Sequence, residues 1–148
     1  MCYGLEVVPT SERGLRQLED AHRQHTKLVQ NVPSNIPTPA PLATLGWMSV
    51  TTHVEIAKLT FMWKTLCLPA QSMYKVLMIC ILNIIMYRKP NGAWFKCSPI
   101  ADMYKVAEKY ALVDILKACI CTGEFGDYKQ NKQMIKKLVQ DNENLKWR

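Results

Sequence analysis

Residues 51–66 read TTHVEIAKLTFMWKTL, and they predict a long helix in the interior of the protein. Apolar side chains recur along this stretch at helical spacing in two adjacent rows, which together form a broad apolar face. Thr51 or Thr52 can begin the helix, and Pro69 breaks it. The two rows are Val54, Ala57 and Phe61, and Ile56, Leu59, Trp63 and Leu66.

Helices are also expected on both sides of this stretch, because capping and helix-breaking residues delimit each periodic apolar segment. No strand pattern and no internal repeat stands out. The sequence therefore predicts an all-α fold, an irregular bundle of about five to six helices. The further helices are one capped by Thr10 or Ser11 and stopped by Pro33, one at 71–87, one that begins at Ser98-Pro99, one at 113–122 that stops at Gly123, and one after Asp127.

The helix expected at residues 71–87 is apolar on nearly every side, and only Lys75 and Asn83 break the pattern. Its uncharged part, residues 76–87, has about 12 residues, whereas a membrane-spanning helix needs about 20. We therefore expect a helix that is buried on every side rather than a membrane span. A chain that must cover such a helix is expected to be only marginally stable on its own.

The chain has 148 residues, and 19 Lys and Arg against 12 Asp and Glu give a formal net charge of +7. A moderately basic chain favours polyanions such as nucleic acid, although solubility alone would explain this charge. Lysines and arginines on helices can neutralise phosphates without reading bases, and a merely solvated face is the competing interpretation. The candidate phosphate contacts are Arg16, Arg23 and Lys27 on the first helix and Lys132, Lys136 and Lys137 on the last.

No catalytic centre is recognisable in the sequence. Metal-assisted phosphoryl transfer needs paired carboxylates, but the acids here are scattered, and the glycines are isolated rather than gathered in a phosphate loop. Cys119-x-Cys121 has no second pair and no nearby His, so we expect no zinc. His22-x-x-His25 lacks a third ligand, and partly buried histidines in a packing seam are expected instead. We predict no catalytic residue, no metal, no cofactor and no small-molecule substrate.

Cysteine usage bears on the compartment. The chain has six cysteines, and no charged segment followed by an apolar run precedes them as in a signal peptide. Cys67 and Cys80 fall in apolar helical stretches, where a free cysteine packs as a small hydrophobe. We therefore expect an intracellular protein, cytoplasmic or nuclear and not secreted.

Short motifs along the chain resemble the region that follows the polymerase domain in reverse transcriptases of non-LTR retrotransposons. Tyr3-Gly4-Leu5-Glu6 resembles a YG-x-E element of that family, and Leu18-Glu19 with His22-Arg23 resembles its LE-x-x-HR helix. The resemblance covers most of the chain and is weak at about residues 68–97. Other similar positions are Leu45-Gly46-Trp47, Tyr110-Ala111-Leu112, Gly123 and the lysine-rich helix that ends at Trp147.

The resemblance implies a thumb-like helical segment that cradles a template–primer duplex by its backbone. It also implies an incomplete unit, because nothing here matches the family's Tyr- or Phe-x-Asp-Asp polymerase motif, its endonuclease domain or its Cys/His cluster. In these terms residues 1–92 form the thumb-like segment, with a proline-rich loop at 33–41, and residues 93–148 form a C-terminal helical segment.

The function expected on this basis is that of a non-enzymatic remnant of a reverse transcriptase that binds the backbone of RNA or DNA weakly and without sequence preference. The alternative is a helical protein–protein interaction module of unrelated origin, in which exposed apolar faces form the interface and the basic residues are incidental. A third interpretation is membrane association through residues 73–87 and their basic flank. The oligomeric state is left open.

Overall fold

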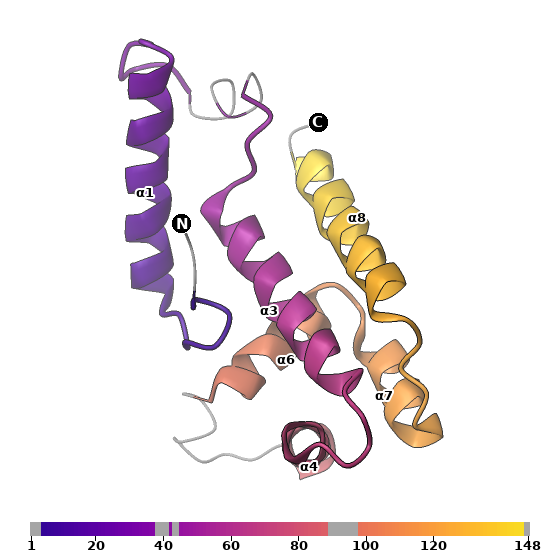
Figure 1. Ribbon diagram of the computed structural model, residues 1–148. Helices are drawn as coiled ribbons and strands as arrows, with labels where there is room; N and C mark the ends of the chain where they lie inside the picture. Colours follow the sequence, from indigo (N-terminus) through magenta and orange to yellow (C-terminus); the bar gives the residue numbers. More distant parts are fainter. Residues whose placement is uncertain (1–3, 38–41, 43–44, 89–97, 147–148) are drawn as a thin grey trace.

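A computed structural model describes residues 4–37, 42, 45–88 and 98–146. Within these ranges the chain forms six α-helices and no strand, which confirms the predicted all-α bundle (Figure 1). Each of these helices is too short or too polar to reach across a membrane. The helices are α1 (Glu12–Val29), α3 (Val50–Leu66), α4 (Met73–Arg88), α6 (Pro99–Lys109), α7 (Val113–Thr122) and α8 (Tyr128–Lys146).

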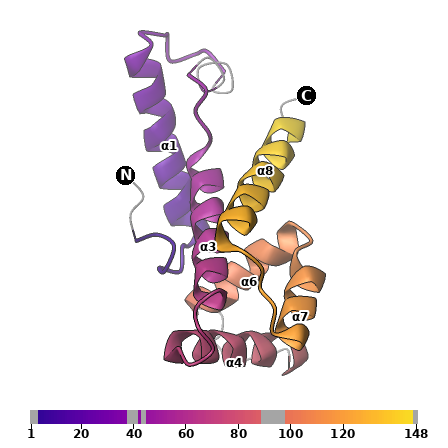
Figure 2. The same ribbon diagram turned by 45° about the vertical axis from the view of Figure 1, so that its right-hand side comes forward.

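The central helix is α3, which packs against α1, α4, α6 and α8. Figures 1 and 2 show α1 and α8 on either side of α3 and α4 across its C-terminal end. Trp63, which belongs to the predicted apolar face, is 1% exposed, and Tyr110, at the end of α6, is 7% exposed. Leu82 of α4, Met103 of α6 and Ile135 of α8 belong to the same buried cluster as Trp63 of α3. Helices from both halves of the chain therefore meet in the core. The interior is therefore built around the stretch 51–66.

The start of α3 differs from the prediction. Thr51 or Thr52 was the expected first cap, but the helix begins at Val50 and its N-cap is Ser49. The Ser49 hydroxyl oxygen accepts the backbone N–H of Thr52 at 3.1 Å, which satisfies one of the free amides of the first turn. The prediction of a threonine cap is wrong because both threonines already have helical backbone.

The end of α1 also differs, since Pro33 was expected to stop this helix and it ends at Val29. Asn31 has a positive φ of 52°. The Asn31 N–H donates to the Leu28 carbonyl at 3.1 Å and the Val32 N–H donates to the Lys27 carbonyl at 3.0 Å. This is the Schellman arrangement, for which Asn is one of the few suitable residues other than Gly. The chain therefore turns away before it reaches the proline.

The other predicted helix signals hold where the structure describes them. Ser98 precedes α6, which begins at Pro99, and Gly123 ends α7 with a φ of 74°. The Asp127 carboxylate accepts the Gln130 N–H at 3.4 Å at the start of α8. Pro39 and Pro41 of the proline-rich loop, residues 89–97 and Trp147 lie outside the described residues.

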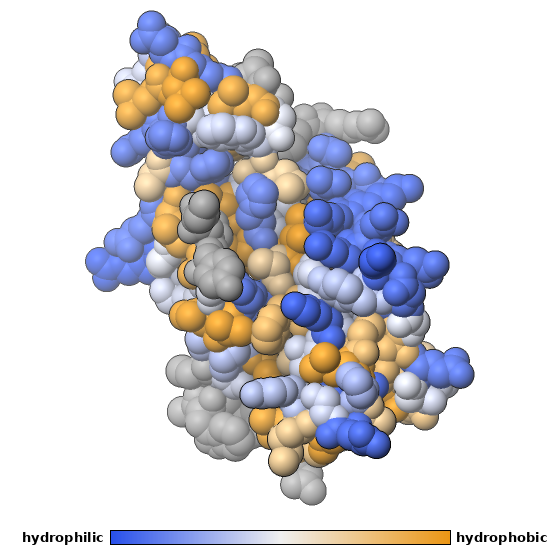
Figure 3. Space-filling model, in the orientation of Figure 1, coloured by the Kyte–Doolittle hydropathy of each residue, from blue (hydrophilic) through white to orange (hydrophobic). Residues whose placement is uncertain are grey.

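The prediction that the helix at 71–87 is buried on every side is wrong. Met78 and Leu82 of α4 face the core, but much of the opposite side of the helix is exposed. The physical reason is that α4 packs against α3 and α6 at one end of the bundle, which leaves its outer side without a neighbour among the described helices. Hydrophobic side chains therefore reach the surface at the lower end of Figure 3. The exposed large apolar residues of α4 are Met73, Tyr74, Val76, Leu77 and Tyr87.

Candidate nucleic-acid interface

The basic stripe predicted on α1 exists, but its charges already have partners. Arg16 pairs with Glu12 at 3.6 Å, and both side chains are largely exposed. Arg23 lies 3.9 Å from Glu19 and 3.8 Å from Asp20. Ion pairs of this kind, three or four residues apart, hold cations against their own helix. Each of the two arginines of this stripe thus has an acidic partner within α1, in ion pairs that solvent screens.

Lys27, the third member of the α1 stripe, is half-buried. Its ammonium group donates to the Ser34 carbonyl oxygen at 2.6 Å, and it lies in the last turn of the helix. A cation there is favoured by the partial negative charge at the helix C-terminus. Lys27 therefore closes the turn after α1, and this role explains its position without a nucleic acid.

The lysines of α8 are in a different state. Lys129, Lys132 and Lys136 follow one another at intervals of three and four residues, so they form one stripe along the helix. Lys137 lies beside this stripe, and it is exposed like Lys136, whereas Lys132 is half-buried. Among the described residues, none of the four is within ion-pair distance of an acid. We call Lys129, Lys132, Lys136 and Lys137 the α8 lysine cluster.

Buried apolar residues fix the orientation of the α8 lysine cluster. Ile135 and Val139 are fully enclosed against the core, and this anchors one side of α8. Lys129, Lys136 and Lys137 stand away from that side, whereas Lys132 lies at its edge and is half-buried; Figure 3 shows hydrophilic residues gathered over α8. The cluster is consequently displayed on a rigid helix rather than on a loop.

The charge order along α8 runs against the helix dipole. Lys129 lies in the first turn, which contains no acid, whereas Asp141 and Glu143 lie near the other end. The partial positive charge of a helix N-terminus disfavours cations by about 0.3–1 kcal/mol each near the first turn. Of the cluster, only Lys129 is close enough to this helix end to be affected, and the Asp127 carboxylate, which accepts the Gln130 N–H, lies at the same end.

Two acids missed by the sequence analysis hold α1 and α8 against α3. Glu19 of α1 is buried, and its carboxylate accepts the Thr51 N–H at 3.2 Å. Glu143 of α8 accepts the Ser49 N–H at 3.1 Å. The first turn of α3 has no acid of its own, so these two carboxylates supply the negative charge that its N-terminus favours. They lie far from their partners in the sequence, so no local pattern indicates them.

The six predicted contacts do not come together. Arg16, Arg23 and Lys27 belong to α1, the other three belong to α8, and α3 lies between these helices in both views of the ribbon (Figures 1 and 2). The structure brings Lys132 and Lys136 into one stripe with Lys129. The candidate interface is therefore α8 alone.

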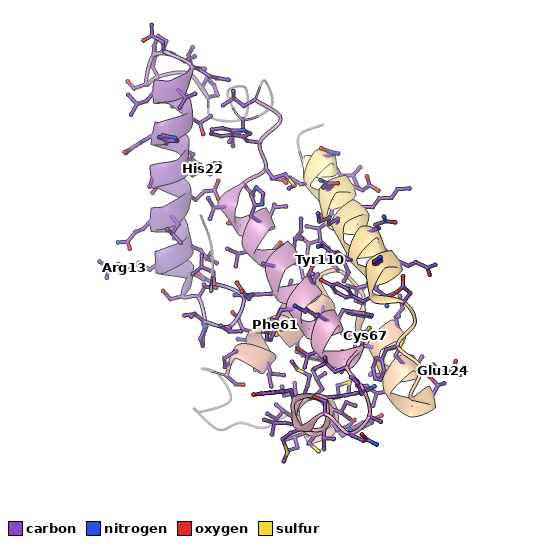
Figure 4. All side chains as sticks on the ribbon, in the orientation of Figure 1. Arg13, His22, Phe61, Cys67, Tyr110 and Glu124 are labelled. Atoms are coloured by element: carbon purple, nitrogen blue, oxygen red, sulfur yellow. The ribbon has the colours of Figure 1, made fainter. Side chains whose placement is uncertain are left out.

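The histidine pair on α1 lies against Trp47. The His22 ring stacks on the indole at a centroid distance of 5.7 Å, and the His25 ring follows at 6.5 Å. His22 is half-buried as expected, and it lies on the side of α1 that faces α3 (Figure 4), but His25 is exposed. The described residues contain no group of three or more side chains that would hold a metal ion. Aromatic packing accounts for the His22-x-x-His25 spacing.

One further polar cluster stabilises the packing of α3 and α6. Lys58 of α3 is only 3% exposed; its ammonium group pairs with the Asp102 carboxylate and donates to the Thr10 hydroxyl at 2.6 Å. A buried ammonium group without partners would cost several kcal/mol, so this arrangement fastens the segment before α1 to α3 and α6.

Burial raises the pKa of the Cys67 thiol, which disfavours the thiolate that a nucleophilic cysteine needs.

Comparison of the chain with protein-family models, with curated proteins and with solved structures finds no match.

Proposed function

We propose that this protein binds the phosphate backbone of RNA or DNA weakly and without sequence preference through the α8 lysine cluster, and that it has no catalytic activity of its own. The observation that carries the proposal is the contrast between the two basic helices. Arg16 and Arg23 of α1 are paired with acids of the same helix, whereas the lysines of the α8 lysine cluster have no ion pair among the described residues.

Unpaired lysines on a rigid helix suit backbone binding for a physical reason. Each lysine that neutralises a phosphate releases a condensed counterion, and this gain does not depend on the base sequence. A cation that already has an ion-pair partner must first give that partner up. Lys129 also lies in the first turn of its helix, where the dipole favours a bound phosphate.

The experiment compares two variants with the same change in charge. Lys132, Lys136 and Lys137 are replaced together by Gln, which is a comparable helix former. In the control, Arg13, Arg16 and Lys105, which are exposed cations of α1 and α6, are replaced by Gln. Binding to labelled duplexes of two unrelated sequences is measured by fluorescence anisotropy from about 50 to 200 mM salt, where backbone contacts dominate.

We expect the α8 variant to bind both duplexes more weakly. The slope of log affinity against log salt should fall by about one unit for each phosphate that the variant no longer neutralises. The control variant is expected to stay close to wild type. If both variants bound the duplexes equally more weakly than wild type, the loss would follow from net charge alone, and a local site on α8 would be refuted. Absence of wild-type binding at about 50 mM salt, where screening is weakest, would refute nucleic-acid binding altogether.

We further propose that the chain derives from the region after the polymerase domain of a non-LTR retrotransposon. The resemblance of the short sequence motifs supports this origin. The genomic sequence upstream of the Met1 codon tests it: an open or broken frame that encodes a Tyr- or Phe-x-Asp-Asp motif is the expected finding. An unrelated upstream sequence would contradict it.

A helical protein–protein interaction module is the second candidate, and the exposed face of α4 favours it. Met73, Val76 and Tyr87 recur on the outer side of this helix at helical spacing. An apolar face of this kind is typical of an interface. Stoichiometric association with another protein that persists at high salt would support this candidate over the first, because phosphate contacts weaken with salt and apolar contacts do not.

A further inference from the structure

A groove of about 440 Å³ opens between α3, α4 and α6. Phe61 of α3 lines it, and Figure 4 labels this side chain on the half of α3 nearer to α4. Leu77 of α4 and Ile100 of α6 form the other walls. The volume falls within the range of small-molecule sites, which are mostly apolar clefts of about 300–1,000 Å³. The groove joins the exposed side of α4, since Leu77 is 54% exposed.

The charge of the groove is as informative as its shape. Among the described residues that line it, Lys64 is the one charged residue and none is an acid. Lys64 is exposed, and no acid among the described residues is within ion-pair distance of it. An apolar cleft with a single unpaired cation at its rim is complementary to a molecule with a long apolar chain and one negative head group.

We propose that this groove binds a long-chain fatty acid, with the alkyl chain between Phe61, Leu77 and Ile100 and the carboxylate paired with Lys64. Burial of the alkyl chain supplies most of the affinity, by about fourfold for each methylene removed from water. Lys64 selects the charged head. No short motif encodes such a site, because its walls come from three helices, and the sequence accordingly predicted no small molecule.

The test uses the full chain and a pair of ligands of equal length. Dodecanoate and dodecan-1-ol are titrated below their aggregation limits, with isothermal titration calorimetry as the readout. Wild type is expected to bind dodecanoate about three- to fivefold more tightly than the alcohol, which is the order of one favourable ion pair to an exposed lysine. Lys64→Gln should abolish this preference and leave the alcohol affinity unchanged. Lys105→Gln, on an exposed lysine of α6 outside the groove, is the matched control.

A second pair of variants separates the groove from the outer face of α4. Leu77→Gln changes a groove wall, whereas Val76→Gln changes the neighbouring exposed residue, which does not line the groove. We expect affinity for both ligands to fall about tenfold in Leu77→Gln and to change little in Val76→Gln. The two positions are similarly exposed, so folding is expected to survive both changes.

Several results would overturn the proposal. Equal weakening in the Leu77 and Val76 variants would indicate adsorption on the α4 surface instead of binding in the groove. If wild type bound dodecanoate and dodecan-1-ol with equal affinity, Lys64 would have no role in binding the carboxylate. The same would follow if Lys64→Gln kept the preference for dodecanoate. If neither ligand showed saturable binding, the groove would not be a fatty-acid site. If the protein dimerised and the dimer excluded the ligand, the groove would instead be covered by a second copy of the chain. None of these variants touches the α8 lysine cluster, so the outcome is independent of nucleic-acid binding.

Discussion

Tyr110 shows how one polar atom is satisfied in the core. Its ring is buried, and its hydroxyl donates a hydrogen bond to the Glu55 carboxylate at 2.6 Å, while Lys109 pairs with the other oxygen of that carboxylate. Burial, followed by the hydrogen bond to Glu55, raises the pKa of Tyr110 far above its usual range. The fold therefore favours the neutral phenol. The stability that Tyr110 contributes is fully present below its unfolded pKa of about 10 and is lost as pH rises above that value.

We expect Tyr110→Phe to lower the free energy of unfolding by about 1.5 kcal/mol at neutral pH, since it removes a hydrogen bond to a charged acceptor. The difference between wild type and variant should shrink as pH rises above about 10, because ionisation then becomes favourable only in the unfolded wild type. Urea denaturation across this range measures both effects. Tyr87→Phe, at an exposed position of α4, is the control and should change little. A difference that stays constant with pH would contradict the assignment.

At the scale of elements, the N-terminal end of α3 is where α1 and α8 are joined to the central helix by hydrogen bonds. Its N-terminal amides receive carboxylates from two other helices, Glu19 of α1 and Glu143 of α8. Each contact also positions the helix that provides it, and Figure 2 shows α1 and α8 diverging from this region. The candidate nucleic-acid face of α8 is thus oriented by an acid on the same helix that takes no part in phosphate binding.

The exposed side of α4 makes a prediction about behaviour in solution. Replacement of Met73, Val76 and Tyr87 together by Gln should leave helical content and the thermal transition close to wild type, because these side chains are exposed and Gln supports helices. The variant should associate less at high protein concentration, since an apolar face has been removed. Circular dichroism and sedimentation velocity provide the measurements. Loss of cooperative unfolding in the variant would instead mean that this face is part of the core.

For the whole molecule, we expect no primer extension in the presence of magnesium or manganese. Phosphoryl transfer of this kind uses metal ions held by neighbouring carboxylates. Asp102 and Glu55, acids that face the interior, are each committed to a lysine. A reverse transcriptase added to the same primer and template serves as the positive control. Extension by this protein that a point substitution within the chain abolishes would contradict the prediction.

The positions of the helices could be predicted from the sequence because helix formation depends on residues only a few positions apart. Ser98-Pro99 and Gly123 delimit helices in the structure much as their local chemistry indicates. The errors at Thr51 and Pro33 are shifts of a few residues, and each arises where a stronger neighbouring signal, Ser49 or Asn31, takes the end of the helix. The core positions of Trp63 and Tyr110 were also predictable, since both lie on apolar helix rows.

The sequence by itself thus determined the all-α class, the approximate helices and the set of available charges. The ion pairs of Arg16 and Arg23 are local, but only the tertiary structure decided that Glu19 and Glu143 bind the first amides of α3, because these groups are remote from one another in the chain. It also decided that α4 is exposed on one side and that Phe61, Leu77 and Ile100 line one groove. Burial and these contacts depend on how whole helices pack against one another. This packing is set by contacts between segments that are distant in the chain, and the local sequence pattern of a single segment does not indicate them.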